Sequence, residues 1–289
     1  MTRIPVTLAQ LEQLVDAEAP TWRKRANDRA QRILTAGEYD EASSIWSEVK
    51  SVFLRLQRYK CSFCERRLAT EDHGGGVEWD LEHFRPKSSV EIWPDGNKFH
   101  YATGAADAVG YYWLAYHLLN YSASCKKCNS PLKKNYFPVL AARGRASDDP
   151  LRLTEIEKPL LPYPVGELDD DPAEIVTFLG LTAIPTKKTG PRRRRADVTI
   201  KFFRLNDRGE LQRERAEVIG YLDLCLRTIR RRSLSDEDRQ AAEEGRDLLL
   251  SPDCRHSACA TAFAALWKSD RTKAREIAKA CRVLLKQIR

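Results

Sequence analysis

The spacing of apolar residues predicts helices toward both ends of the chain. Leu8, Leu11, Leu14 and Val15 recur at intervals that place their side chains on one face of a helix. The pattern is stronger over residues 45–56, which read IWSEVKSVFLRL, and it predicts a second helix there. From about residue 210 onward the same period dominates and predicts further helices, including those over 218–229 and 277–288.

Between these helical ends, turn-forming residues break the pattern. Glycines and prolines between residues 65 and 110 favour short strands and loops. The aromatic run YYWLAYHLLNY at 111–121 predicts a helix or helix-like segment, and the segment EIVTFLG at 174–180 predicts a strand. The proline- and aspartate-rich stretch before that strand predicts an irregular connection, and KKTGPRRRR at 187–195 predicts a basic loop.

Together these patterns predict an α+β fold that is predominantly α-helical. We expect an N-terminal helical region over 1–55, a core that carries the chemistry over 56–145, and a mixed linker with a C-terminal helical region over 146–289. Hydrophobic residues at 42% and charged residues at 31% of 289 residues are typical of a globular protein. The sequence contains no apolar run of about 18 residues, so it predicts no membrane span. The first residues lack a signal-peptide pattern, so we expect a cytoplasmic location.

The net charge of +8 has two explanations. A polyanionic partner would account for it, because cations that neutralise phosphates release counterions. A moderately basic protein without such a partner would account for it equally well. The charged run at 187–195 is open in the same way: it could hold a nucleic-acid backbone or an acidic partner, or simply be solvated.

Two C-x-x-C pairs give the strongest chemical signal. Cys61 and Cys64 form one pair, Cys125 and Cys128 the other, and 60 residues lie between them. Each pair places two thiols on one tight turn, and two pairs complete the four-sulfur shell that structural zinc prefers. The alternatives are unrelated buried cysteines or a redox-active pair with a reactive thiol. The other four cysteines are scattered, and Cys254, His256 and Cys259 lack a fourth ligand for a second metal site.

The segment between the cysteine pairs carries a recognisable set of motifs. EHFRPK at 82–87, the run WLAY before Asn120, and Asn129 directly after the last cysteine complete the order C-x-x-C, E-H, N, C-x-x-C-N. This combination resembles the HNH endonucleases of the ββα-metal fold. In particular it is similar to the PtuB-like nucleases of Septu-type anti-phage defence systems, over roughly residues 55–220.

The resemblance implies a role for each motif residue. His83 would be the general base that activates water, which suits a histidine because its ordinary pKa is about 6.5. Glu82 and Asn129 would ligate the catalytic ion, and oxygen ligands favour Mg²⁺ or Mn²⁺. Asn120 would brace the loop that bears the base. The zinc site would hold Asn129 opposite Glu82 and His83.

Four cations nearby are candidates for contacts with the substrate phosphates. They are Arg85, Lys87, Lys133 and Lys134. The spacing CNSPLKK departs from the usual C-N-x-x-K of the family, so the choice between Lys133 and Lys134 stays open. His117 occupies a position where related sequences more often have tryptophan, and we interpret it, with His100, as a packing or solvent-facing residue.

The leading hypothesis is therefore a metal-dependent HNH endonuclease that cleaves nucleic acid, and we expect its substrate to be DNA rather than RNA. The resemblance also implies that it is the effector of a bacterial defence system and acts with an ATPase partner of the PtuA-like type. The second hypothesis is a zinc-stabilised nucleic-acid-binding or adaptor module without catalysis. The three intact motif residues Glu82, His83 and Asn129 favour the first hypothesis.

Overall fold

The structure is a computed structural model. It describes the whole chain apart from residues 2, 70–77, 232, 234 and 288–289. Ile288, the last residue of the final predicted helix, therefore lies outside the described residues. Within the described ranges, no helix combines the length and the apolar character needed to cross a membrane.

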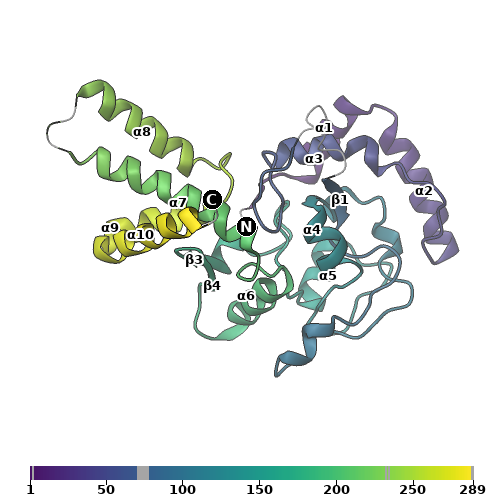
Figure 1. The fold of residues 1–289 in the computed structure, drawn as a ribbon. Coiled ribbons are helices and arrows are strands. Elements are labelled where there is room, and N and C mark those ends of the chain that lie inside the picture. The colour runs from purple at the N-terminus through teal and green to yellow at the C-terminus, as the bar shows by residue number, and fades with distance from the viewer. Residues whose placement is uncertain (2, 70–77, 232, 234, 288–289) are drawn as a thin grey trace.

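Helices dominate the fold and the sheets are small, which confirms the predicted α+β class (Figure 1). The helices are α1 (Leu8–Glu18), α2 (Trp22–Ala36), α3 (Lys50–Leu56), α4 (Lys126–Cys128), α5 (Pro150–Glu157), α6 (Gly190–Phe202), α7 (Gly209–Thr228), α8 (Asp236–Leu250), α9 (Ser257–Ser269) and α10 (Arg271–Gln287). The strands are β1 (Trp79–His83), β2 (Tyr121–Cys125), β3 (Val176–Leu179) and β4 (Thr182–Pro185). In Figure 1, α7 to α10 lie together and project from the rest of the molecule.

The N-terminal predictions are confirmed with small changes. The helix predicted from Leu8 is α1, and Thr7 caps it because its hydroxyl accepts the Gln10 N–H while the Gln10 side chain accepts the Thr7 N–H. The helix predicted over 45–56 forms as a 3₁₀ turn at Trp46–Val49 that continues directly into α3.

The sheet that matters for the chemistry is the antiparallel pair of β1 and β2. Its register places Trp79 opposite Cys125 and His83 opposite Tyr121. The helix or helix-like segment predicted over 111–121 forms only as two short 3₁₀ helices, Tyr112–Leu114 and Leu118–Asn120, and the chain then enters β2 at Tyr121. Tyr121 has no exposed surface and pairs with β1, so tertiary packing overrides the local helical pattern.

The hairpin of β3 and β4 confirms one prediction, and the helix α6 that follows it corrects another. The strand predicted at 174–180 is β3, which pairs with β4. The basic loop predicted over 187–195 is wrong from residue 190 onward, because α6 begins at Gly190 with Pro191 in its first turn. Proline suits that position, since the first turn of a helix leaves its N–H groups without helical partners. Three of the four arginines there form ion pairs within the chain: Arg192 with Asp170 and Glu174, Arg193 with Asp197, and Arg195 with Asp169 and Asp170.

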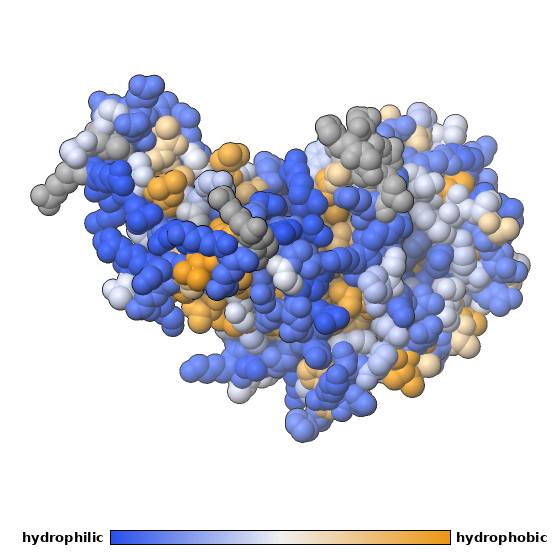
Figure 2. Space-filling model, in the orientation of Figure 1, coloured by the Kyte–Doolittle hydropathy of each residue, from blue (hydrophilic) through white to orange (hydrophobic). Residues whose placement is uncertain are grey.

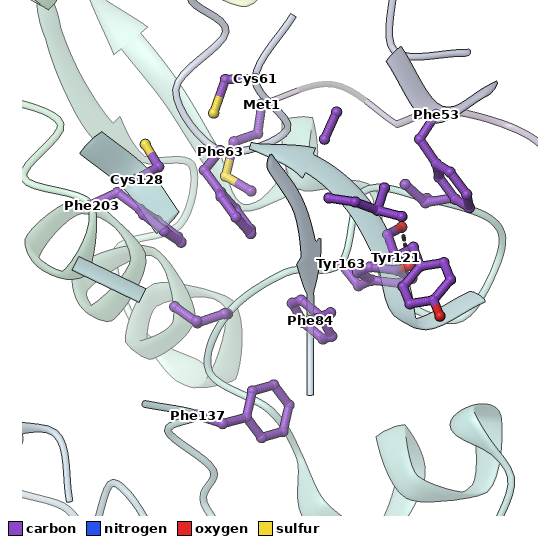
Figure 3. Packing of buried hydrophobic residues seen from close by; sticks show 14 of the residues in the cluster. Met1, Phe53, Cys61, Phe63, Phe84, Tyr121, Cys128, Phe137, Tyr163 and Phe203 are labelled. Atoms are coloured by element: carbon purple, nitrogen blue, oxygen red, sulfur yellow. Dashed lines mark hydrogen bonds between the residues drawn. The ribbon is translucent and has the colours of Figure 1, made fainter. Parts of the chain in front are cut away.

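Buried apolar side chains form two clusters. One runs from Met1 to Leu211 and surrounds the paired strands β1 and β2, and the other runs from Ala216 to Cys281 within the C-terminal helices. Figure 3 shows the aromatic part of the first cluster, where Phe63 stacks on Phe203 with ring centroids 4.2 Å apart. Phe63 lies between Cys61 and Cys64, so this stack supports the first cysteine turn. Outside, hydrophilic residues predominate on the face shown in Figure 2.

A buried ion pair joins the loop after β1 to α5. Glu157 has no exposed surface, and its carboxylate accepts hydrogen bonds from Arg85 Nε at 3.2 Å, the Tyr111 hydroxyl at 2.7 Å and the Gly144 N–H at 2.9 Å. The guanidinium of Arg85 is also buried and donates to Thr154. Removing either charge therefore leaves the other in the interior without compensation.

We expect Glu157→Ala to lower the free energy of unfolding by about 3–5 kcal/mol, because it strands the Arg85 charge in the core. Urea unfolding followed by circular dichroism measures this. Glu155→Ala on the same helix is the matched control: that carboxylate is 59% exposed in its pair with Arg152, so we expect a loss below about 1 kcal/mol. Equal losses in the two variants would contradict the argument.

Candidate active site

The four cysteines of the two C-x-x-C pairs converge in space. Their sulfur atoms all lie within 4.8 Å of one another, and all four residues are buried. The Sγ atoms of Cys64 and Cys125 are 3.8 Å apart. Sulfurs at the corners of a tetrahedron around zinc, with Zn–S bonds of about 2.3 Å, would be about 3.8 Å apart. The four thiols are free rather than joined in disulfides, so the cluster can hold a zinc ion.

An arginine from outside the cysteine turns contacts this cluster. Arg208, directly before α7, donates from Nη1 to the sulfur of Cys128 at 3.2 Å and also pairs with Glu210. Only 8% of Arg208 is exposed. Four thiolates around Zn²⁺ carry a net negative charge, which a buried guanidinium offsets. The thiolate in turn raises the pKa of Arg208 above its ordinary range.

The antiparallel pairing of β1 with β2 brings the acidic and imidazole groups to the same place as the second cysteine pair. β1 ends in Glu82 and His83, β2 ends in Cys125, and Asn129 follows the short helix α4. These elements enclose a cavity of about 390 Å³. Its lining contains Glu82, His83 and Asn129, together with Asp80, Trp46, Lys50, Lys87, Lys134 and several smaller residues.

His83 is held by contacts on three sides. Its Nε2 lies 2.9 Å from the carbonyl oxygen of Ala115, and its ring meets Trp46 and Tyr121 edge-on at centroid distances of 4.8 and 5.0 Å. A carbonyl oxygen can only accept a hydrogen bond, so Nε2 carries the proton of the neutral ring. The other nitrogen, Nδ1, is then the atom that can accept a proton.

Burial keeps this imidazole neutral. Loss of solvation, with a smaller effect from Lys87 and Lys133, lowers the pKa of His83 to about 3. The ring is therefore unprotonated at neutral pH, as a general base must be before it acts.

Glu82 is buried and already has a cationic neighbour. Its Oε1 lies 3.2 Å from Nζ of Lys133, and only 6% of Glu82 is exposed. Burial raises the pKa of Glu82, while Lys133 and Lys87 oppose that rise. Burial also lowers the pKa of Lys133. The ion pair of Glu82 and Lys133 is thus buried. Glu82 lines the cavity, whereas Lys133 has no exposed surface.

Asn129 is hydrogen-bonded directly to Asp80. Its Nδ2 donates to Asp80 Oδ2 at 3.0 Å, and Lys126 pairs with the same carboxylate. Because the amide nitrogen points at Asp80, the Asn129 oxygen remains an available acceptor. These oxygen donors suit a hard cation such as Mg²⁺ or Mn²⁺ in kind. In the described part of the chain, however, only the four cysteines form a group of three or more His, Cys, Asp or Glu side chains close enough to share an ion.

Asn120 bonds to the backbone directly after His83. Its Oδ1 accepts the N–H of Arg85 at 2.8 Å, and its Nδ2 donates to the carbonyl oxygens of Arg85 and Leu114. Asn120 is 2% exposed and lies behind the cavity rather than in its lining. The bonds fix the path of the chain that leaves His83.

The four cations expected to meet phosphate fall into two groups. Lys87 and Lys134 line the cavity. Arg85 does not, because its guanidinium is buried against Glu157, which corrects the expectation that it contacts substrate. Lys133 is likewise fully buried against Glu82, so between the two lysines left open by the sequence the structure offers Lys134 to the cavity.

The cavity and cluster residues that the sequence analysis did not identify include Asp80, Trp46 and Arg208. Asp80 had a usable signal, since alternate residues of a strand share a face and Asp80 lies two residues before Glu82. Trp46 belongs to the helical pattern predicted over 45–56; it packs against the core and also lines the cavity beside His83. No sequence pattern indicated Arg208, because it lies 80 residues from Cys128 in the chain.

The remaining candidates behave as ordinary structural residues. His117 is mostly buried and accepts the Leu119 N–H, and His100 is exposed. His256 contacts Glu214 through Nε2 at 2.9 Å, while Cys259 donates to the Gly180 carbonyl. The second metal site considered for Cys254, His256 and Cys259 is therefore not formed.

Comparison with known proteins gives one informative match. Over 176 residues the chain is 32% identical to the Septu protein PtuB of Bacillus mycoides (strain KBAB4). The chain is similar to a Septu protein. The matched segment covers 61% of this chain and 52% of the relative, so it spans about half of the relative's length. No family model matches the chain. No solved structure matches it either.

Replacing one cysteine of the cluster should remove the metal and much of the stability. We expect wild-type protein to hold about one zinc ion per chain, and Cys64→Ser to lose most of it, because structural zinc needs all four ligands. Metal analysis by mass spectrometry together with thermal unfolding measures both effects. The control Cys225→Ser, on α7 outside the cluster, should keep its zinc; loss of zinc in both variants, or in neither, would contradict the assignment.

Arg208 should tune the affinity of the cluster for zinc. We expect Arg208→Gln to weaken zinc binding by about 10–100-fold, since partners of metal ligands typically contribute that much. Competition with a chromogenic chelator measures the affinity. Arg213→Gln is the control, because Arg213 is exposed on the same helix; an effect as large as that of Arg208→Gln would show that charge alone matters.

Proposed function

We propose that this protein is a metal-dependent endonuclease of the HNH type that hydrolyses phosphodiester bonds in nucleic acid, and we expect DNA rather than RNA to be the substrate. The observation that carries the proposal is the shared cavity of Glu82, His83 and Asn129, with Lys87 and Lys134 beside them. A neutral buried base, oxygen ligands and cations at one place are what phosphodiester hydrolysis requires.

In this mechanism His83 takes the proton of the attacking water on Nδ1. The Nε2–H bond to Ala115 fixes the tautomer, and Trp46 and Tyr121 hold the ring in its plane. Burial favours the neutral ring before the reaction. It also makes the protonated ring a strong acid, which passes its proton on readily afterwards.

The other residues bind and orient. Glu82 and Asn129, with Asp80 beside them, would hold Mg²⁺ or Mn²⁺, and the bound ion would stabilise negative charge on the phosphate and on the leaving oxygen. Lys87 and Lys134 face the cavity and can contact phosphate oxygens. Asn120 keeps the chain after His83 in place, and a displacement of about 1 Å at such a site can cost on the order of 100-fold in rate.

The zinc cluster contributes position rather than chemistry. Cys128 is directly followed by Asn129, and Cys125 ends the strand that pairs with β1. A closed four-sulfur shell has no open position for water or substrate. It therefore holds the two halves of the cavity together.

The similarity to the Septu protein PtuB supports a biological setting for this activity. We propose that the chain is the effector of a bacterial anti-phage defence system and acts with an ATPase partner of the PtuA-like type. Both statements extend the likeness of the matched segment to the whole protein.

A second function is favoured by one observation. Glu82 already faces Lys133 in a buried pair, so its carboxylate is neutralised without a metal ion. This arrangement fits a zinc-stabilised nucleic-acid-binding or adaptor module that does not cut. The two functions differ in whether loss of His83 changes cleavage.

We expect His83→Ala to reduce cleavage by about 10²–10⁴-fold, the usual contribution of a general base. The assay uses plasmid DNA, single-stranded DNA and RNA with Mg²⁺ or Mn²⁺, with and without the ATPase partner, because a partner can hold the nuclease inactive. His117→Ala is the control, since His117 caps a turn behind the cavity. Cleavage that is equal in His83→Ala and wild type would reject the catalytic role, and nucleic-acid binding without cleavage under every condition would favour the second function.

A further inference from the structure

The helices α8 and α10 of the C-terminal group carry opposite charges. α10 contains six basic residues and a single acidic one, Glu276. α8 contains six acidic residues and two basic ones, Arg239 and Arg246. Within the C-terminal group the basic surplus is thus gathered on α10.

Five of the α10 cations lie on one side of the helix. They are Arg271, Arg275, Lys279, Arg282 and Lys286, at successive intervals of four, four, three and four residues. With 3.6 residues per turn, these intervals keep all five within an arc of about 80° and spread them over about 22 Å. The buried residues Ala274, Ala278 and Cys281 occupy a different arc and face the cluster of the C-terminal helices. We call the five cations the α10 stripe.

Most of the α10 stripe has no counter-ion within the protein. Arg282 pairs with Asp223 at 2.7 Å, and Arg275 lies over the Trp267 ring. Among the described residues, no acidic side chain pairs with Arg271, Lys279 or Lys286, and all three are exposed.

The α10 stripe differs in this respect from the basic run that the sequence made conspicuous. The arginines of 192–195 are largely neutralised by neighbouring carboxylates. Several arginines of α2 are paired as well, Arg25 with Glu48 and Arg29 with Glu41. A row of cations without acidic partners on one side of a helix therefore distinguishes α10 from the other basic segments.

We propose that the α10 stripe binds the phosphate backbone of nucleic acid. The cations recur about every 6 Å along the helix axis, and duplex DNA carries one negative charge per about 1.7 Å of its axis, so a row of unpaired cations can neutralise several phosphates at once. Of the large apolar residues within the described part of α10, Val283 is the exposed one. A protein partner would need more apolar anchors than that. The proposal rests on nucleic acid being the substrate, but not on cleavage.

The test is equilibrium binding of the full chain, carrying His83→Ala, to a fluorescent 30-base-pair duplex without added Mg²⁺. Arg271→Gln/Lys279→Gln/Lys286→Gln removes three stripe charges while keeping good helix-forming residues. Each lost phosphate contact lowers the slope of log K against log salt by about 0.9. We expect the slope to fall by about 2–3 and the affinity at 0.1 M salt to fall at least about 10-fold.

A variant with the same change in net charge is the control. Lys24→Gln/Arg32→Gln/Lys188→Gln removes three exposed cations elsewhere, and we expect its slope to fall by less than about 1. Equal losses in the two variants would overturn the proposal, because they would reflect net charge alone. An unchanged slope in the stripe variant would also overturn the proposal. Binding to polyglutamate is measured alongside duplex binding. If the stripe variant loses binding to polyglutamate but keeps the duplex slope of wild type, the stripe is a docking surface for an acidic protein instead.

The result is separable from the proposed nuclease activity. If wild type and His83→Ala cleave equally while the stripe variant loses duplex binding, the catalytic role fails and the stripe stands. If cleavage depends on His83 but the stripe variant binds duplex as wild type does, the stripe fails and the nuclease stands.

Discussion

The convergence of four thiols on one point is the constraint on which the candidate site depends. Cys61 and Cys64 come from a turn after α3, whereas Cys125 and Cys128 flank the junction between β2 and α4. An ion bound by all four would join segments 60 residues apart in the chain. Glu82 and His83 lie on the strand paired with β2, and Asn129 follows Cys128. The positions of the four sulfurs therefore help to fix the relative positions of Glu82, His83 and Asn129 in the cavity.

The buried character of the cavity depends on elements outside this metal-linked segment. Trp46, from the turn before α3, covers one edge of His83. Arg208 reaches the sulfur of Cys128 from the start of the C-terminal helices. The N-terminal and C-terminal regions thus contribute directly to the electrostatics of the site, although the motifs themselves lie between residues 61 and 129.

The sequence predicts correctly those features that depend on residues close together in the chain. The two C-x-x-C turns, the Glu82-His83 pair and the helical periods of α1, α7 and α10 are local patterns, and each is found where it was expected. The misassigned segments have non-local causes: the run at 111–121 is shaped by pairing with β1. Arg85 and Lys87 belong to one motif, yet only the first has Glu157, 72 residues away, as a partner. The full burial of Arg85 and the partial exposure of Lys87 could not be predicted from their spacing. The start of α6 within the basic run could have been predicted from the sequence, because Pro191 is typical of the first turn of a helix.

The order of the contributing residues has a consequence for the protein as it is being made. Domains generally form as the chain emerges from the ribosome, from the N-terminus onward. The first cysteine turn emerges early, but its second pair of ligands follows only after β1 and β2 have both appeared. The guanidinium beside Cys128 comes 80 residues later still. A nascent chain therefore passes through a long stage in which Glu82 and His83 exist but lack their fixed geometry, so synthesis itself delays the moment at which the cavity is complete.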